Sequence, residues 1–203
     1  MEIPEKSKKY KFISANTISA ISKTEMAIFD ILKDNYNKYD EIIFLCIGTD
    51  RSTGDCLGPL VGYKLSRMIL NEKVYVFGTI DEPVHAKNIS SYMEMIENEF
   101  IDPFIIAIDA ALGNEENINC ISVAKGSLSP GAAVRKKLPM IGNAHITGIV
   151  NTGGFMEFAI LQNTRLSTVV RMSDIIVGGI ILSLRRLSGG AELFAQKETA
   201  AVF

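Results

Sequence analysis

Two stretches of the chain are apolar at almost every position. Residues 41–48 read EIIFLCIG and residues 103–110 read PFIIAIDA. A strand with one face in water alternates apolar and polar residues, so these runs are typical of strands buried on both faces of a parallel sheet. Between them, residues 57–70 place apolar side chains at helical spacing. The order strand, helix, strand predicts an α/β fold.

The rest of the chain extends this alternation. We expect a single three-layer α/β domain over residues 1–203, with a twisted, mostly parallel sheet and helices on both faces. Residues 1–14 are expected to form a flexible or loosely docked arm, and residues 188–203 a flexible tail. The other expected elements are strands at 73–80 and 119–124, a short strand or loop at 145–151, and helices at 16–38, 87–98 and 164–187.

Length and composition limit the class of protein. A chain of 203 residues fits one domain, and 47% hydrophobic with 22% charged residues is typical of a soluble globular protein. The net charge of −2 gives no electrostatic reason to expect nucleic acid or an anionic membrane as the main partner. The apolar run at residues 175–184 is shorter than the roughly 20 residues that span a bilayer, so we expect a buried helix there and no membrane partner.

The cysteines indicate neither a disulfide framework nor a cysteine zinc site. Cys46, Cys56 and Cys120 are odd in number and form no CxxC pair. A reducing cytoplasm is therefore the expected compartment.

Acidic residues follow three successive predicted strands. Asp50 and Asp55 come after the first strand, Asp81 and Glu82 after the second, and Asp109 ends the third. In a sheet of this kind, ligands gather beyond the carboxyl ends of the strands. An acidic cluster there could bind a divalent cation, or it could hold a proton between two carboxylates whose pKa values are pushed apart.

These acids are not equally informative. An aspartate after a strand is often a helix cap or a turn residue, which is the simpler interpretation of Asp50 and Asp81 and an alternative for Asp55. Asp109 interrupts a buried apolar stretch, and a buried carboxylate needs a partner. We therefore take Asp55 and Asp109 as the candidate catalytic pair and Asp50 and Asp81 as accessory candidates.

Other chemistries fit the motifs less well. The loop GTDRSTGDCLG matches neither the GxxxxGK[ST] nor the GxGxxG pattern, so no nucleotide or other cofactor site is expected. Cys56 adjoins Asp55 and has no histidine near it in sequence, which disfavours a thiolate nucleophile. The two histidines, His85 and His145, fall in loop-like segments near the acidic edge, and either could be a metal ligand or an acid–base group.

Five motifs, in order, resemble the YyaC-type sporulation proteins of spore-forming bacteria, a spore protease family. They are IGTDRSTGDCLGPLVG, GTIDEPVHAKN, IAIDAALG, KGSLSPGAAVRKKLP and ITGIVNTGGFMEFAILQNTRLS, and the similarity extends over about residues 40–186. This family is similar in fold to the spore germination protease and to the hydrogenase maturation endopeptidases. The resemblance thus implies a twisted, mostly parallel sheet flanked by helices.

The resemblance also implies site residues. Asp55 in GDCLGP and Asp109 in AIDAAL match the two aspartates of the germination protease. In the maturation proteases a histidine in an HQxG-like segment completes a metal-binding set, and His145 in HITG fits that position by local pattern. The first acid of that set is Asp55 here rather than a glutamate, which argues against a nickel-reading site.

The implied function is an aspartate-dependent endopeptidase of sporulation or germination that cleaves a protein or peptide substrate and requires no cofactor. One alternative is a maturation-type protease in which Asp55, Asp109 and His145 hold a divalent metal. Another is a non-catalytic, protease-like binding scaffold in the forespore. The expected location is the cytoplasm of the forespore or spore, and the apolar helix at residues 165–187 makes a homodimer plausible.

Overall fold

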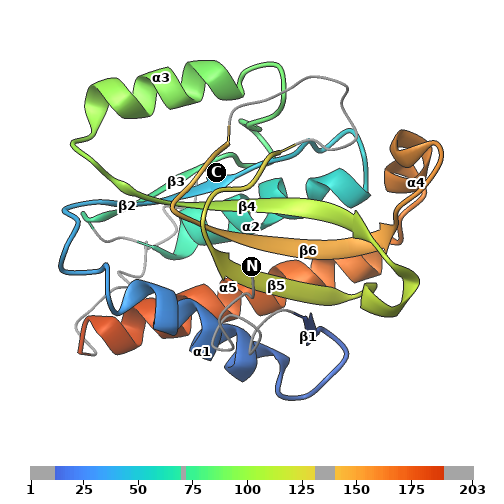
Figure 1. Cartoon of the computed structure of the whole chain (residues 1–203), viewed down its shortest axis with the longest axis horizontal. Coiled ribbons are helices and arrows are strands. Elements are labelled where there is room, and N and C mark those ends of the chain that lie inside the picture. The colour runs from blue at the N-terminus through green and yellow to red at the C-terminus, as the bar shows by residue number, and fades with distance from the viewer. Residues whose placement is uncertain (1–11, 70–71, 131–139, 190–203) are drawn as a thin grey trace, which may run out of the picture.

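The computed structural model describes residues 12–69, 72–130 and 140–189, and these residues form a mixed sheet covered by helices. The sheet has 6 strands in the order β1-β5-β6-β4-β2-β3 (Figure 1). The strands are β1 (Ile13–Ser14), β2 (Ile42–Cys46), β3 (Val74–Phe77), β4 (Phe104–Gly113), β5 (Cys120–Lys125) and β6 (Ala144–Thr152).

The central part of the sheet is parallel, as predicted. β2 pairs in parallel with β3 and β4, and β4 pairs in parallel with β6. β5 runs antiparallel to β6, and β1 runs antiparallel to β5, so one edge of the sheet departs from the parallel arrangement. The carboxyl ends of β2, β4 and β6 therefore point the same way, toward the short helix α4 (Glu157–Gln162) (Figure 1).

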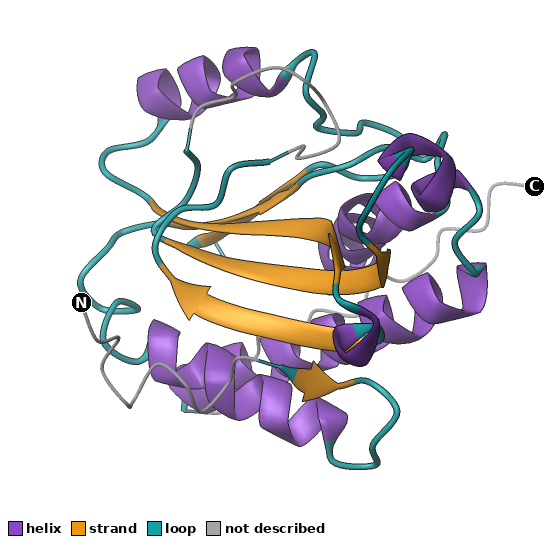
Figure 2. Cartoon of the chain, turned by 45° about the vertical axis from the view of Figure 1, so that its right-hand side comes forward, coloured by secondary structure: helices purple, strands orange, loops and turns teal. Residues whose placement is uncertain are grey.

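Helices cover both faces of the sheet, which confirms the predicted α/β class. Side chains of α1 (Ala20–Leu32), α2 (Leu57–Met68) and α5 (Leu166–Leu187) pack on one face, and those of α3 (Ile89–Glu99) pack on the other (Figures 1 and 2). β2 supplies both cores because its side chains alternate. Phe44 and Cys46 lie on the three-helix face, and Ile43 and Leu45 lie on the α3 face.

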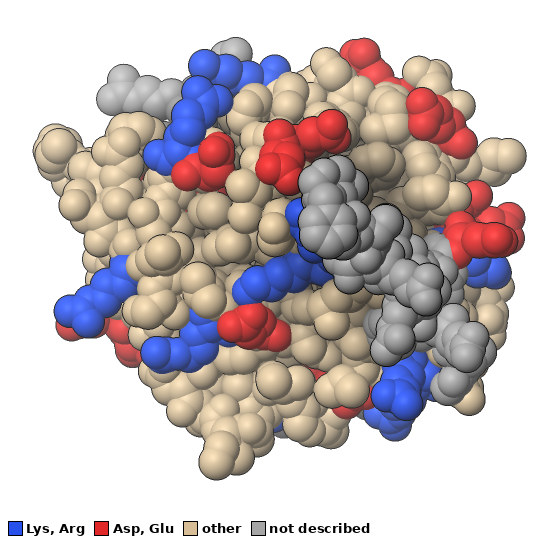
Figure 3. Space-filling model, turned by 180° about the vertical axis from the view of Figure 1, so that it is seen from behind, with Lys and Arg blue, Asp and Glu red and all other residues tan. Residues whose placement is uncertain are grey.

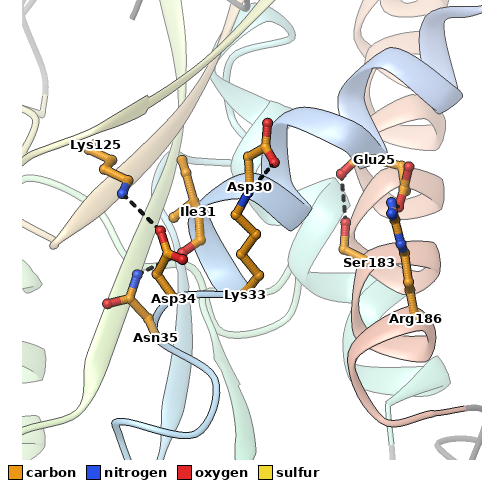
Figure 4. Close-up of polar contacts among 9 residues, drawn as sticks. All are labelled: Glu25, Asp30, Ile31, Lys33, Asp34, Asn35, Lys125, Ser183 and Arg186. Carbon is orange, nitrogen blue, oxygen red and sulfur yellow. Dashed lines mark hydrogen bonds and ion pairs between the residues drawn. The ribbon is translucent and has the colours of Figure 1, made fainter. Parts of the chain in front are cut away.

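Helix α1 lies along α5 and is held there by polar contacts at its edge (Figure 4). The Ser183 hydroxyl lies 2.9 Å from the carbonyl oxygen of Glu25 and 2.8 Å from that of Gly179. The Arg186 guanidinium donates to the Glu25 carboxylate at 3.2 Å. A Cβ atom on Gly179 would lie 2.8 Å from the Thr24 side chain, so the glycine permits the close approach of the two helices.

By length and composition alone, α5 could cross a membrane. In the fold it is a core helix, because Val169, Met172, Ile176 and Ile180 are fully buried in the main hydrophobic cluster. This agrees with the predicted buried helix and with a soluble-type domain that is compatible with the cytoplasm. Acidic and basic side chains are interspersed over the face seen in Figure 3, in keeping with the small net charge.

Three features differ from the sequence-based expectations. Ile13 and Ser14, assigned to a flexible or loosely docked arm, form β1 beside β5, and Ile13 is buried. The remainder of that arm described by the structure is Phe12, while residues 1–11 and the tail residues 190–203 lie outside the described residues. Asp109 does not end its strand, because β4 continues to Gly113. Helix α4 was not predicted.

The first turn of α2 depends on a glycine. A Cβ atom on Gly58 would lie 2.1 Å from the carbonyl oxygen of Ile47, a backbone atom that cannot turn aside. We expect Gly58→Ala to lower the free energy of unfolding by about 2 kcal/mol or more, because the helix must move off the strand. Chemical denaturation measures this change.

Gly153→Ala is the matched control, because its Cβ atom would meet nothing closer than 3.8 Å. Equal denaturation midpoints for Gly58→Ala and the wild type would show that α2 does not need this close approach.

Candidate active site

A cavity of about 550 Å³ opens beyond the carboxyl end of β2 and beside the middle of β4. Its wall comes from the segment after β2, the segment after β3, the middle of β4 and one side of α4. The lining residues are Ile47, Gly48, Thr49, Arg51, Ser52, Asp55, His85, Ala86, Lys87, Asp109, Pro130, Phe158, Leu161 and Gln162. Asp55 and Asp109 thus line one cavity, Asp55 from the turn after β2 and Asp109 from within β4.

The loop after β2 holds Asp55 by folding back on itself. The amide of Gly48 donates to the Val84 carbonyl at 2.8 Å, and the amide of Thr49 donates to the Asp55 carbonyl at 3.1 Å. Gly48 has a φ of +142°, and a Cβ atom there would lie 2.0 Å from the Asp55 carbonyl oxygen. Only glycine fits this position. Asp55 itself lies in a single 3₁₀ turn, Gly54–Cys56, which leads directly into α2.

Asp109 reaches the cavity from within a strand. Ile105 and Ala107 of β4 pack in the same cluster as α3, and the alternation of a strand puts Asp109 on that face as well. The residue is only 6% exposed, and the Ala110 amide donates to its Oδ1 atom at 2.8 Å. The acid that interrupts the apolar run is therefore part of the cavity wall.

Burial is the main influence on the Asp55 carboxyl group. Loss of solvent raises the pKa of Asp55 above its ordinary value, while a hydrogen bond from the Thr49 backbone and the charge of His85 oppose that rise. A raised pKa favours the protonated form, which is the state that a general acid needs near neutral pH. His85 is close enough to Asp55 for its charge to lower the pKa of the Asp55 carboxyl group.

The backbone of His85 is fixed by its own loop. The His85 amide donates to Asn88 Oδ1 at 2.8 Å, and Asn88 Nδ2 donates in turn to the Pro83 carbonyl at 3.0 Å. Val84 forms a parallel bridge with Ile47, which holds the whole segment beside the end of β2. His85 therefore lines the cavity next to the loop that carries Asp55.

Two polar atoms of the cavity-lining residues have no hydrogen-bond partner. They are the Ser52 Oγ and the His85 Nδ1 atoms, both shielded from solvent. An unsatisfied buried polar group costs about 1–3 kcal/mol. The other unpartnered buried side-chain atoms in the described part of the chain belong to Thr24 and Glu41, away from the cavity lining.

The remaining predicted site residues do not line this cavity. Asp50 and Asp81 are both exposed. His145 is the second residue of β6, where it pairs with Ala107, and its Nδ1 atom lies 2.8 Å from the Gly126 carbonyl oxygen. The accessory roles predicted for these three residues therefore find no support in the geometry.

The predicted metal set is not assembled. No group of three or more His, Cys, Asp and Glu side chains within residues 12–69, 72–130 and 140–189 could hold a metal ion. Because His145 lies outside the cavity, it does not complete a set with Asp55 and Asp109. The residues present thus do not fit the metal site of the second hypothesis.

Sequence reasoning missed several lining residues. It weighed His85 but preferred His145, and it gave no role to Ser52, Phe158 or Leu161. All four residues lie in motifs that carry the family resemblance: Ser52 in IGTDRSTGDCLGPLVG, His85 in GTIDEPVHAKN, and Phe158 and Leu161 in ITGIVNTGGFMEFAILQNTRLS. Membership of a motif did not single these side chains out, because their place in the cavity wall depends on how the fold brings the motifs together.

Residues 16–179 match the model of the family described as "Protein of unknown function (DUF1256)". The chain belongs to this family. It is 42% identical over 175 residues to the "Uncharacterized protein YyaC" of Bacillus subtilis (strain 168), a match that covers 86% of this chain and 84% of the relative. The predicted resemblance to YyaC-type proteins is therefore confirmed as a family relationship.

Solved structures with a similar fold are hydrogenase maturation proteases. The [NiFe] hydrogenase maturation protease HycI of Thermococcus kodakarensis KOD1 superposes with a TM-score of 0.50 at 17% identity, covering 77% of this chain and 99% of that one. The hydrogenase maturating endopeptidase HybD of E. coli gives a TM-score of 0.44 at 14% identity, covering 73% and 94%. The HycI match supports the α/β fold that the resemblance implied.

The raised pKa of Asp55 makes a prediction about stability. The folded pKa lies above the unfolded one, so the contribution of the protonated group is fully present below the unfolded pKa, near 4, and is lost as the pH rises through the folded pKa. Asp55→Asn stays neutral and escapes this loss. We expect the variant to gain stability relative to the wild type as the pH rises from about 4 to 7.

Thermal unfolding of both proteins across this range measures the difference, and Asp81→Asn controls for the removal of one surface carboxylate. A wild type that gains stability relative to Asp55→Asn as the pH rises would contradict the raised pKa.

Proposed function

We propose that the protein is a peptide-bond hydrolase in which Asp55 and Asp109 form the catalytic pair. The observation that carries this proposal is the meeting of these two acids, from the segment after β2 and from β4, in one cavity of about 550 Å³. The exposed acids Asp50 and Asp81 do not line it. The substrate is a protein or peptide segment that enters from the open side.

The two acids have different roles in the proposed mechanism. Burial raises the pKa of Asp55, and we assign the role of proton donor to this residue. It polarises the scissile carbonyl and then protonates the leaving amine. Asp109 acts as the base and takes a proton from the attacking water. After cleavage, the proton on Asp109 must return to Asp55, which a shared site or a bridging water permits.

The comparisons support the proposal through the fold. The similarity to HycI supports the fold, and proteolysis is the activity named for that protein. We propose proteolysis for this chain because the motifs around Asp55 and Asp109 resemble the two aspartate motifs of the germination protease. A role in sporulation or germination, inside the forespore, is proposed from the family resemblance.

Two further expectations are proposals of the same kind. We propose that hydrolysis needs no metal or other cofactor, so a chelator should leave activity unchanged.

We also propose that the apolar side chains exposed on α5, among them Leu166, Val170 and Leu182, contact a second copy of the chain. Sedimentation velocity of the purified protein tests for that homodimer.

The catalytic pair predicts the result of two single substitutions. Asp55→Asn and Asp109→Asn are each expected to lower kcat/KM by at least about 100-fold, because each removes one proton-transfer step. The substrate is a synthetic peptide library that contains every pair of neighbouring amino acids, and mass spectrometry identifies the products between about pH 5 and pH 8.

Asp50→Asn and Asp81→Asn are the controls, because each removes an exposed carboxylate from a loop near the cavity without entering it. Circular dichroism and thermal unfolding establish that all four variants are folded. Full activity in a folded Asp109→Asn variant would end the paired-aspartate proposal. Absence of cleavage by the wild type under all conditions would favour the binding scaffold.

A further inference from the structure

We propose that Ser52 and His85 are substrate-binding residues of the cavity, and that Ser52 Oγ and His85 Nδ1 form hydrogen bonds with the main chain of a bound peptide. The inference rests on the proposed hydrolase function and adds to it the groups that hold the substrate beside the two acids. It also identifies the histidine of the site as His85, with a binding role rather than a metal-ligating one.

Ser52 is a buried polar residue with nothing to bind in the free protein. Its side chain is 5% exposed, lines the cavity, and has an Oγ atom without a hydrogen-bond partner. Buried hydroxyl groups are nearly always paired, so an unpaired one in a cavity wall indicates a partner that arrives later. A serine hydroxyl is turned by a single side-chain torsion, and Ser52 belongs to the loop that carries Asp55. A peptide at Asp55 would therefore pass close to it.

His85 presents the same situation on a backbone that is held in place, and a turn of its side-chain torsions would bring Nδ1 to the substrate. Its backbone is held by Asn88 and by the Val84 bridge, yet its ring Nδ1 atom is buried and unpaired. The second histidine provides a comparison within the same chain, because the Nδ1 atom of His145 lies 2.8 Å from the Gly126 carbonyl oxygen. The structure thus satisfies the ring nitrogen of the histidine outside the cavity and leaves that of the histidine inside it without a partner.

The chemistry of the two groups fits a peptide main chain. A serine hydroxyl can donate or accept, an imidazole nitrogen does one or the other according to its protonation and tautomer, and a peptide presents both carbonyl and amide groups. Much of the remaining wall is apolar, including Ile47, Phe158 and Leu161. A main chain that enters such a wall needs polar partners, since its groups lose their water there. Ser52 and His85 would supply them.

The first experiment separates a binding role of Ser52 from a structural one. Ser52→Ala is expected to lower kcat/KM about tenfold toward the best-cleaved library peptide, the loss of one hydrogen bond. Its midpoint of thermal unfolding should not fall, because the substitution removes an unsatisfied hydroxyl. Thr24→Val is the matched control, since Thr24 Oγ1 is also buried and unpaired but lies away from the cavity lining. This variant should keep the wild-type kcat/KM.

The second experiment tests which nitrogen of His85 binds. An asparagine side chain places a polar group where Nδ1 lies, whereas a glutamine places one where Nε2 lies. We expect His85→Asn to retain kcat/KM several-fold better than His85→Gln toward the same peptide. The reverse order would overturn the assignment of Nδ1 and indicate that the other nitrogen meets the substrate.

The outcomes distinguish this inference from the proposed function. Cleavage by the wild type with no loss in Ser52→Ala or in either His85 variant would overturn the inference and leave the hydrolase standing. A fall in the unfolding midpoint of Ser52→Ala, together with the loss of activity, would show that the residue is structural. If the wild type cleaves nothing, the hydrolase is overturned, and equal binding of the library peptides by the wild type and Ser52→Ala would then overturn the binding role as well.

Discussion

The contact between the first turn of α2 and the end of β2 is the constraint on which the rest of the site depends. Gly58 allows the helix to approach the Ile47 backbone, and Gly48 allows the chain to close on the Asp55 carbonyl. Further along the helix, a Cβ atom on Gly62 would lie 1.9 Å from the Gly78 carbonyl oxygen. Gly48, Gly58 and Gly62 let strand, loop and helix pack so closely that the position of the Asp55 backbone is fixed.

The cavity sets polar groups into a largely apolar wall, and this has an energetic cost in the free protein. Asp55 loses solvent, and Ser52 and His85 each carry a buried atom without a partner. Such groups are unfavourable for folding and favourable for binding, because a ligand can satisfy them. The two large cores, on the two faces of the sheet, provide the stability that makes the arrangement tolerable.

Much of the fold could be predicted because the pattern of apolar residues within each long helix and strand indicates its type. The unbroken apolar runs of β2 and β4 reflect burial on two faces, and the helical spacing of α2 and α5 reflects burial on one. The short elements β1 and α4 were not predicted, because neither is long enough to show the spacing of apolar residues that distinguishes a strand or a helix. Asp109 was recognisable as an acid inside an apolar run, whereas its place within β4 depends on how far the sheet extends.

The two histidines show that a short sequence motif does not determine which residue reaches the cavity. The segment HITG resembles the histidine segment of the maturation proteases. The parallel register of β4 and β6, however, puts His145 opposite Ala107, and its Nδ1 atom lies within hydrogen-bond distance of the Gly126 carbonyl oxygen. His85 reaches the cavity through the bridge between Ile47 and Val84, a contact between segments that are distant in sequence. Pairing of this kind is a property of the folded sheet, and no spacing within either motif encodes it.

The order of the strands also has a consequence for how the protein assembles. β5 precedes β6 in the chain, yet β6 lies between β4 and β5 in the sheet. β1, near the start of the chain, pairs only with β5 among the described strands. The parallel strands β3, β2 and β4 can pair before β6 is made, but β5 and β1 join the same sheet only once residues 144–152 lie between β4 and β5. During synthesis, the segment that becomes β1 is made early and is among the last to find its partner.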